Sequence, residues 1–79
     1  MVVVTTWPKD DRVRVDARQV RLVMVLRRLR PNSQLFLRLR VFYLSGEKRD
    51  LLVRDSELSK LENAGIEIRN SPRLVEESE

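Results

Sequence analysis

The sequence contains neither cysteine nor histidine. Disulfide bonds, thiolate and imidazole metal ligands, and catalytic pairs that use either residue are therefore excluded. The longest uninterrupted apolar run covers only residues 22–26, whereas a membrane-spanning helix needs roughly 20 apolar residues. Because cysteine is absent and no signal-peptide pattern follows Met1, we expect a cytoplasmic protein that does not enter a membrane.

Catalytic motifs are missing as well. The only acidic cluster considered as a Mg²⁺ site that could cleave phosphodiesters consists of Asp50, Asp55 and Glu57, and it lacks the accompanying lysine that a metal-dependent nuclease motif would require. Asp55 is fully explained as a helix cap, and Ser56 and Ser59 have no neighbouring base that could activate them. We therefore expect no enzymatic activity, no cofactor and no metal site.

Lysine is scarce, with three residues against thirteen arginines, and the arginines are clustered. Residues 12–40 hold nine arginines and a single acidic residue, Asp16, which gives this segment a net charge of +8, while the rest of the chain is neutral to acidic. Clustered guanidinium groups bind phosphates and carboxylates. A GC-rich or thermophilic genome would explain the excess of arginine over lysine equally well, but it would not explain the clustering.

The first half of the chain is predicted to form short strands followed by a helix. Residues 1–6 and 12–15 are rich in β-branched residues and flank a polar turn, which favours a hairpin or two short strands. Asp16 and Gln19 then suit a capping box, and Pro31 disfavours helical geometry before it, so a helix is predicted over residues 17–30. Its apolar stripe would consist of Leu22, Val25, Leu26 and Leu29.

The alternative for residues 20–26 is a strand, because Val20, Val23 and Val25 are β-branched. In the helical interpretation a second apolar set, formed by Ala17, Val20 and Met24, lies opposite the leucine stripe. This set is explained either by burial under the N-terminal segment or by a contact with a second subunit.

The second half shows a clearer pattern. Residues 34–44 alternate as a strand, residues 45–48 form a turn, and residues 49–54 complete a hairpin. A short helix is predicted over residues 56–63, capped by Asp55 or Ser56 and ended by Gly65, followed by a last strand over residues 66–69. The domain is predicted to span residues 1–72, with residues 73–79 as a flexible acidic tail.

This order predicts one small α+β domain with the ferredoxin-like βαββαβ arrangement, in which two helices cover one face of an antiparallel sheet, with or without an additional N-terminal strand. The other face of the sheet would remain open. Alternation within residues 34–44 directs the leucines toward the helices and a mixed set of aromatic and basic side chains toward the open face, namely Phe36, Arg38, Arg40 and Phe42.

An open face of this kind suits single-stranded nucleic acid, because aromatic rings stack on bases while guanidinium groups bind the phosphate backbone. Arg12 and Arg14 would join it from a neighbouring strand. The competing interpretation is that Phe36 and Phe42 are covered by the N-terminal segment or by a second subunit, with Arg38 and Arg40 at the rim.

A second basic surface is predicted on the helix over residues 17–30. Its members are Arg18, Arg21, Arg27, Arg28 and Arg30, which could follow the phosphates of a duplex. A solvated helix face with ion pairs is the competing explanation.

The function predicted from the sequence is non-catalytic binding of nucleic acid, either DNA or RNA, through phosphate-dominated contacts with little sequence specificity. The alternative is a subunit or adaptor of a protein assembly, for example a homodimer, whose arginines face an acidic partner.

Overall fold

The computed structural model describes residues 1–78, including every side chain in this range except those of residues 32, 77 and 78. The chain forms six strands, one α-helix and two short 3-10 turns. In chain order these elements are β1 (Val2–Thr5), β2 (Arg12–Val15), a 3-10 turn (Ala17–Gln19), β3 (Val20–Arg30), a 3-10 turn (Pro31–Ser33), β4 (Phe36–Tyr43), β5 (Lys48–Arg54), α1 (Asp55–Asn63) and β6 (Ile68–Ser78).

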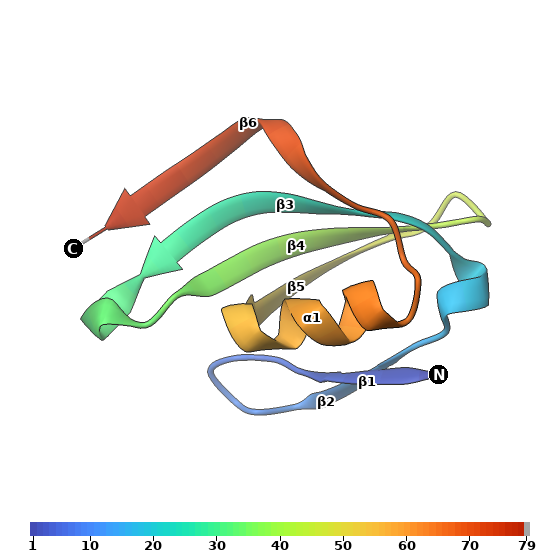
Figure 1. The fold of residues 1–79 in the computed structure, drawn as a ribbon, viewed down its shortest axis with the longest axis horizontal. Helices are drawn as coiled ribbons and strands as arrows, with labels where there is room; N and C mark the ends of the chain where they lie inside the picture. The colour runs from blue at the N-terminus through green and yellow to red at the C-terminus, as the bar shows by residue number, and fades with distance from the viewer. Residues whose placement is uncertain (79) are drawn as a thin grey trace.

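The strands form a four-stranded mixed sheet and a separate two-stranded hairpin (Figure 1). The larger sheet has the order β5-β4-β3-β6; β3, β4 and β5 are antiparallel neighbours, and β6 runs parallel to β3. The β1–β2 hairpin is attached to the β5 edge through a bridge between Thr6 and Val53 and a 2.8 Å hydrogen bond from the Trp7 N–H to the Leu52 carbonyl. The protein is therefore a small compact α+β domain made mostly of strands.

The helix predicted over residues 17–30 is wrong. Asp16 does accept a hydrogen bond from the Arg18 N–H, at 3.0 Å, but it caps only the single 3-10 turn before β3. From Val20 onward the chain is a strand whose Val23 and Val25 are fully buried. The strand is favoured because β-branched residues suit it and because β4 and β6 pair with it on both sides. With one helix among residues 1–78, the predicted ferredoxin-like arrangement with two helices is not found.

The predicted helix of the second half is confirmed, with its start one residue earlier at Asp55. The predicted cap is not, because Arg54 occupies the N-cap position without a side-chain hydrogen bond. Asp55 and Glu57 instead place negative charge in the first turn, where the helix dipole favours it. Gly65 follows the helix with a φ of 83°, the left-handed conformation expected after a C-terminus.

The core lies between the four-stranded sheet on one side and α1 with the hairpin on the other (Figure 1). Its centre is formed by alternate residues of β4 and by residues that face them from the covering elements. These fully or almost fully buried residues include Leu37, Leu39 and Val41 of β4, Val4 and Val15 of the hairpin, and Leu61 of α1. We call this side of the sheet the inner face and the opposite side the outer face.

The last strand extends beyond the predicted residues 66–69. β6 begins at Ile68 and continues to Ser78, and its residues 75–78 pair with residues 27–30 of β3. The acidic stretch predicted as a tail is thus part of the sheet as far as Ser78, while Glu79 lies outside the described residues. In the described part of the chain, no helix has the length and apolar character that crossing a membrane requires.

Candidate functional site

The outer face of the sheet combines basic and apolar side chains. It lies opposite the core between the sheet and α1, and Trp7 of the β1–β2 loop packs on it at Phe36. Strand alternation directs its members away from the buried residues of the inner face, and the strand register places them opposite one another. They are Leu22, Met24, Arg27 and Leu29 of β3, Phe36, Arg38, Arg40 and Phe42 of β4, and Lys48, Asp50, Leu52 and Arg54 of β5. The four residues of β4 that the sequence assigned to an open face therefore do share one face.

On β3, β4 and β5 positive charge dominates this face, because these three strands contribute five basic residues and one acidic residue, Asp50. Arg27 of β3 lies directly opposite Arg38 of β4. Like charges in directly opposite positions destabilise a strand pair. Arg38 is exposed, and among residues 1–78 it has no ion pair. The Arg38 guanidinium is therefore available to a bound anion.

Arg40 differs from Arg38 because it is engaged in a bidentate ion pair. Its Nε and Nη2 donate to the two carboxylate oxygens of Asp50, at 2.8 and 3.1 Å. The hydrogen bond from Arg40 is the main reason why the pKa of Asp50 lies below its usual value, and the same contact raises the pKa of Arg40. Fork-to-carboxylate geometry of this kind also fits a phosphate, so Asp50 occupies a position that a phosphate group could take.

Phe36 is covered, whereas Phe42 is partly exposed. The ring of Trp7 packs on Phe36 with centroids 4.5 Å apart, and the Arg54 guanidinium lies 6.0 Å from the centroid of the Phe36 ring. These contacts leave Phe36 only 2% exposed. The alternative that the N-terminal segment covers the aromatic residues of this face is thus found for Phe36, and Phe42 remains as the aromatic residue available for contact.

The other predicted arginines lie elsewhere. Arg12 and Arg14 alternate with the buried Val13 and Val15 of β2, so they project from the hairpin and do not join the outer face. The predicted helical basic surface does not form, because Arg18 lies in the 3-10 turn before β3 and the others belong to β3, with the exposed Arg21 and Arg30 near its two ends.

Arg27 and Arg28, neighbours in sequence, lie on opposite faces of the sheet. Arg28 is on the inner face, opposite Leu37, and its Nη1 donates to Glu76 at 3.0 Å. Only Arg27 of the predicted helical set therefore belongs to the outer face.

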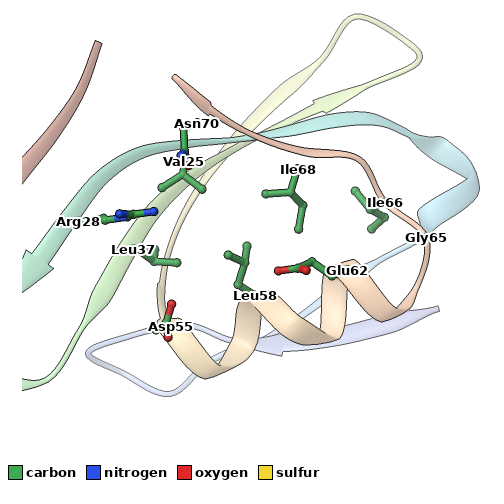
Figure 2. Close-up of a pocket in the computed structure, with 10 residues that line it drawn as sticks. All are labelled: Val25, Arg28, Leu37, Asp55, Leu58, Glu62, Gly65, Ile66, Ile68 and Asn70. Atoms are coloured by element: carbon green, nitrogen blue, oxygen red, sulfur yellow. The ribbon is translucent and has the colours of Figure 1, made fainter. Parts of the chain in front are cut away.

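A cleft of about 500 Å³ lies on the inner side, between α1 and the β3–β6 pair (Figure 2). Its floor is apolar, including Leu37 and Ile68, and Figure 2 shows Arg28 on its sheet side with Asp55 and Glu62 on its helix side. Two carboxylates at the rim disfavour a phosphate backbone. This cleft is therefore not a continuation of the basic outer face.

The acidic residues considered above for a metal site are separated in the fold. Asp50 pairs with Arg40 on the outer face, and Glu57 is 8% exposed and accepts a 2.6 Å hydrogen bond from the Thr5 N–H. Among the described residues no three acidic side chains lie close enough together to hold a metal ion. The role of Glu57 in joining α1 to the hairpin was missed at the sequence level, because its partner is 52 positions away.

Comparison of the chain with protein-family models, with curated proteins and with solved structures finds no match.

Proposed function

We propose that the protein is a non-catalytic nucleic-acid-binding protein whose outer face binds a single strand of DNA or RNA. The observation that carries this proposal is the exposed Arg38, which has no ion pair among residues 1–78 and shares its sheet face with the partly exposed Phe42. A phosphodiester backbone supplies closely spaced negative charges, and guanidinium groups bind them with favourable geometry. Contacts of this type give affinity with little sequence specificity.

Apolar side chains beside the arginines support the choice of a single strand. Phe42 is partly exposed and is flanked by the half-buried Leu22 of β3, while Leu52 of β5 lies opposite Arg38. Unstacked bases bind to such surfaces through their ring faces, and an aromatic side chain is the preferred platform. Duplex nucleic acid offers no accessible ring faces, so it would use the arginines alone.

The first test removes one guanidinium group from the outer face. Arg38→Ala should weaken binding to a labelled single-stranded oligonucleotide of any sequence, and it should reduce the slope of log K against log salt by roughly 0.7 for each lost phosphate contact. Arg14→Ala is the matched control, because Arg14 is an equally exposed strand arginine on the hairpin. Fluorescence anisotropy at several salt concentrations measures the affinity and the salt slope of each variant. Equal losses for the two variants would contradict the assignment of the outer face.

Phe42→Ala gives a second result from the same assay. Loss of stacking should cost about 1–3 kcal/mol of binding free energy and leave the salt slope almost unchanged. Phe36→Ala does not serve this purpose, because Phe36 is packed under Trp7 and its loss would affect folding. A Phe42→Ala variant that binds as tightly as the wild type would argue for contacts through the arginines alone, and thus for a duplex partner.

Asp50→Asn should have the opposite effect and strengthen binding. The substitution removes the acidic group that β5 contributes to the outer face and releases Arg40 from its bidentate pair. The salt slope should increase by roughly 0.7, because one more guanidinium group is available for phosphate. Glu47→Asn removes an equal charge from the exposed β4–β5 turn and serves as the control. A tighter complex for both variants alike would indicate only a change in overall charge.

A second candidate function follows from the apolar part of the same face. Leu22, Met24, Phe42 and Leu52 are half-buried on a surface that no element covers, and such surfaces also form subunit interfaces. A homodimer through this face would bury Arg27 and Arg38 together with their counterparts. Analytical ultracentrifugation separates the two functions, since a dimer that Phe42→Glu converts to a monomer would favour the assembly.

A further inference from the structure

The second half of β6 lies along the most arginine-rich part of β3. Residues 75–78 pair with residues 27–30, which include Arg27, Arg28 and Arg30. Glu76 accepts a 3.0 Å hydrogen bond from Arg28, and Glu77 follows it in the strand. An acidic segment of the chain therefore occupies the sheet edge beside three arginines.

The two residues of this segment whose side chains the structure describes, Val75 and Glu76, are exposed. The pairing between β3 and β6 is interrupted, because it passes from Asn70 directly to Val75, and Pro72 in between has no N–H to donate. Val75 is 42% exposed and the Glu76 side chain 67% exposed. Exposed ion pairs contribute little to stability, and segments with few buried contacts open at low free energy.

Separation of residues 75–78 would leave the core intact. The first half of β6 pairs with the buried part of β3 through Ile68, and Leu74 packs against the core cluster. Beyond Leu74, the contacts that the structure describes are the backbone pairing with β3 and the ion pair between Glu76 and Arg28. Its departure would expose the edge of β3, with Arg27 on the outer face and Arg28 on the inner face.

We propose that residues 75–78 compete within the molecule for the arginines of β3, so that a nucleic acid strand must displace them to bind fully. This inference rests on the proposed function and extends the binding surface from Arg38 to the β3 edge. Carboxylates and phosphates use the same guanidinium donors, so Glu76 and a phosphate group at the β3 edge exclude each other at Arg28, which lies on the sheet side of the cleft away from Asp55 and Glu62 on its helix side.

The test compares the full chain with a variant that lacks residues 75–79. Binding of a labelled oligothymidylate of about 12 nucleotides, a length that one small domain can contact, is measured over a range of salt concentrations. The truncated protein should bind about tenfold more tightly at low salt, with a slope steeper by roughly 0.7 for each arginine gained. Glu76→Gln/Glu77→Gln, which keeps the strand, should give a smaller change in the same direction.

The control variant loses as many negative charges as the truncated protein, but at positions outside residues 75–79. Asp11→Asn/Glu47→Gln/Glu62→Gln removes three negative charges from exposed side chains that have no ion pair within residues 1–78. If this variant gains as much affinity as the truncated one, the competition is disproved and only overall charge matters. If the full chain binds but truncation has no effect, the inference fails while the proposed function stands. If neither form binds at low salt, the proposed function fails and the competition fails with it.

Discussion

Replacing Leu39 with alanine is expected to lower the free energy of unfolding by about 2–5 kcal/mol. Leu39 is fully buried in the centre of the sheet, where β4 places it opposite Val25 of β3 and Leu51 of β5. Removal of its side chain leaves a cavity between strands that cannot collapse easily, because they are held in register on both sides. Urea unfolding measures the loss, and an unchanged m-value would show that the extent of unfolding is the same.

Met24→Ala is the matched control. Met24 is also in the middle of a strand, but it lies on the outer face opposite Arg40 and is only half-buried. Its truncation should cost clearly less than that of Leu39. Equal losses at the two positions would mean that the outer face is buried in solution, and they would favour the homodimer over the nucleic acid complex.

The second half of the fold is predictable because its pattern is local. The alternation of Leu37, Leu39 and Val41 with polar or aromatic residues continues without interruption through β4. The turn at Gly46, whose φ is 94°, and the left-handed Gly65 lie where the sequence indicates the ends of elements. In this half, each signal and the structure that it specifies are within about ten residues of each other.

The first half misleads because β3 is irregular. Its register shifts between Val20 and Leu22 and again between Val25 and Arg27. Each irregularity inserts a residue, so the side chains on the inner side fall at residues 20, 23, 25 and 28. The apolar stripe that predicts a helix, Leu22, Val25, Leu26 and Leu29, therefore combines residues of different faces, since Leu22 and Leu29 lie on the outer face and Val25 on the inner face. Residues 20–30 form a strand because β4 and β6 pair with them on both sides, and this pairing cannot be predicted from the local sequence.

The site shows the same division between local and distant information. That Phe36, Arg38, Arg40 and Phe42 share one face follows from alternation alone. The cover of Phe36 by Trp7 depends on how the N-terminal segment meets β5. The ion pair between Arg40 and Asp50 depends on the register between β4 and β5. The pairing of the acidic residues 75–78 with β3 is likewise a long-range, charge-assisted contact without a periodic signal in the sequence.

Glu57→Ala is expected to destabilise the protein by about 1–3 kcal/mol, because it leaves a partly buried backbone donor without a partner. The Glu57 carboxylate of α1 joins this helix to β1. It accepts the Thr5 N–H of β1 at 2.6 Å and an ion pair from Lys60 one helical turn later at 2.9 Å. Its side chain is only 11% exposed, so water cannot replace these contacts readily.

The Glu57 carboxyl group should also make the free energy of unfolding depend on pH. Burial raises the pKa of Glu57, but the hydrogen bonds from Lys60 and the Thr5 N–H together lower it by more than burial raises it. The pKa of Glu57 in the folded state therefore lies below its ordinary value of 4.5. A carboxyl group with a depressed pKa stabilises the fold above its unfolded pKa, and this contribution is lost as the pH falls through the folded value. Wild type should therefore be more stable than Glu57→Gln at neutral pH, and the difference should shrink below a pH of about 4.5. Because all other carboxyl groups are shared by the two proteins, this difference in unfolding free energy isolates Glu57. A difference that stays constant down to a pH of about 3 would contradict the assignment of an ionised Glu57 as the link between α1 and the hairpin.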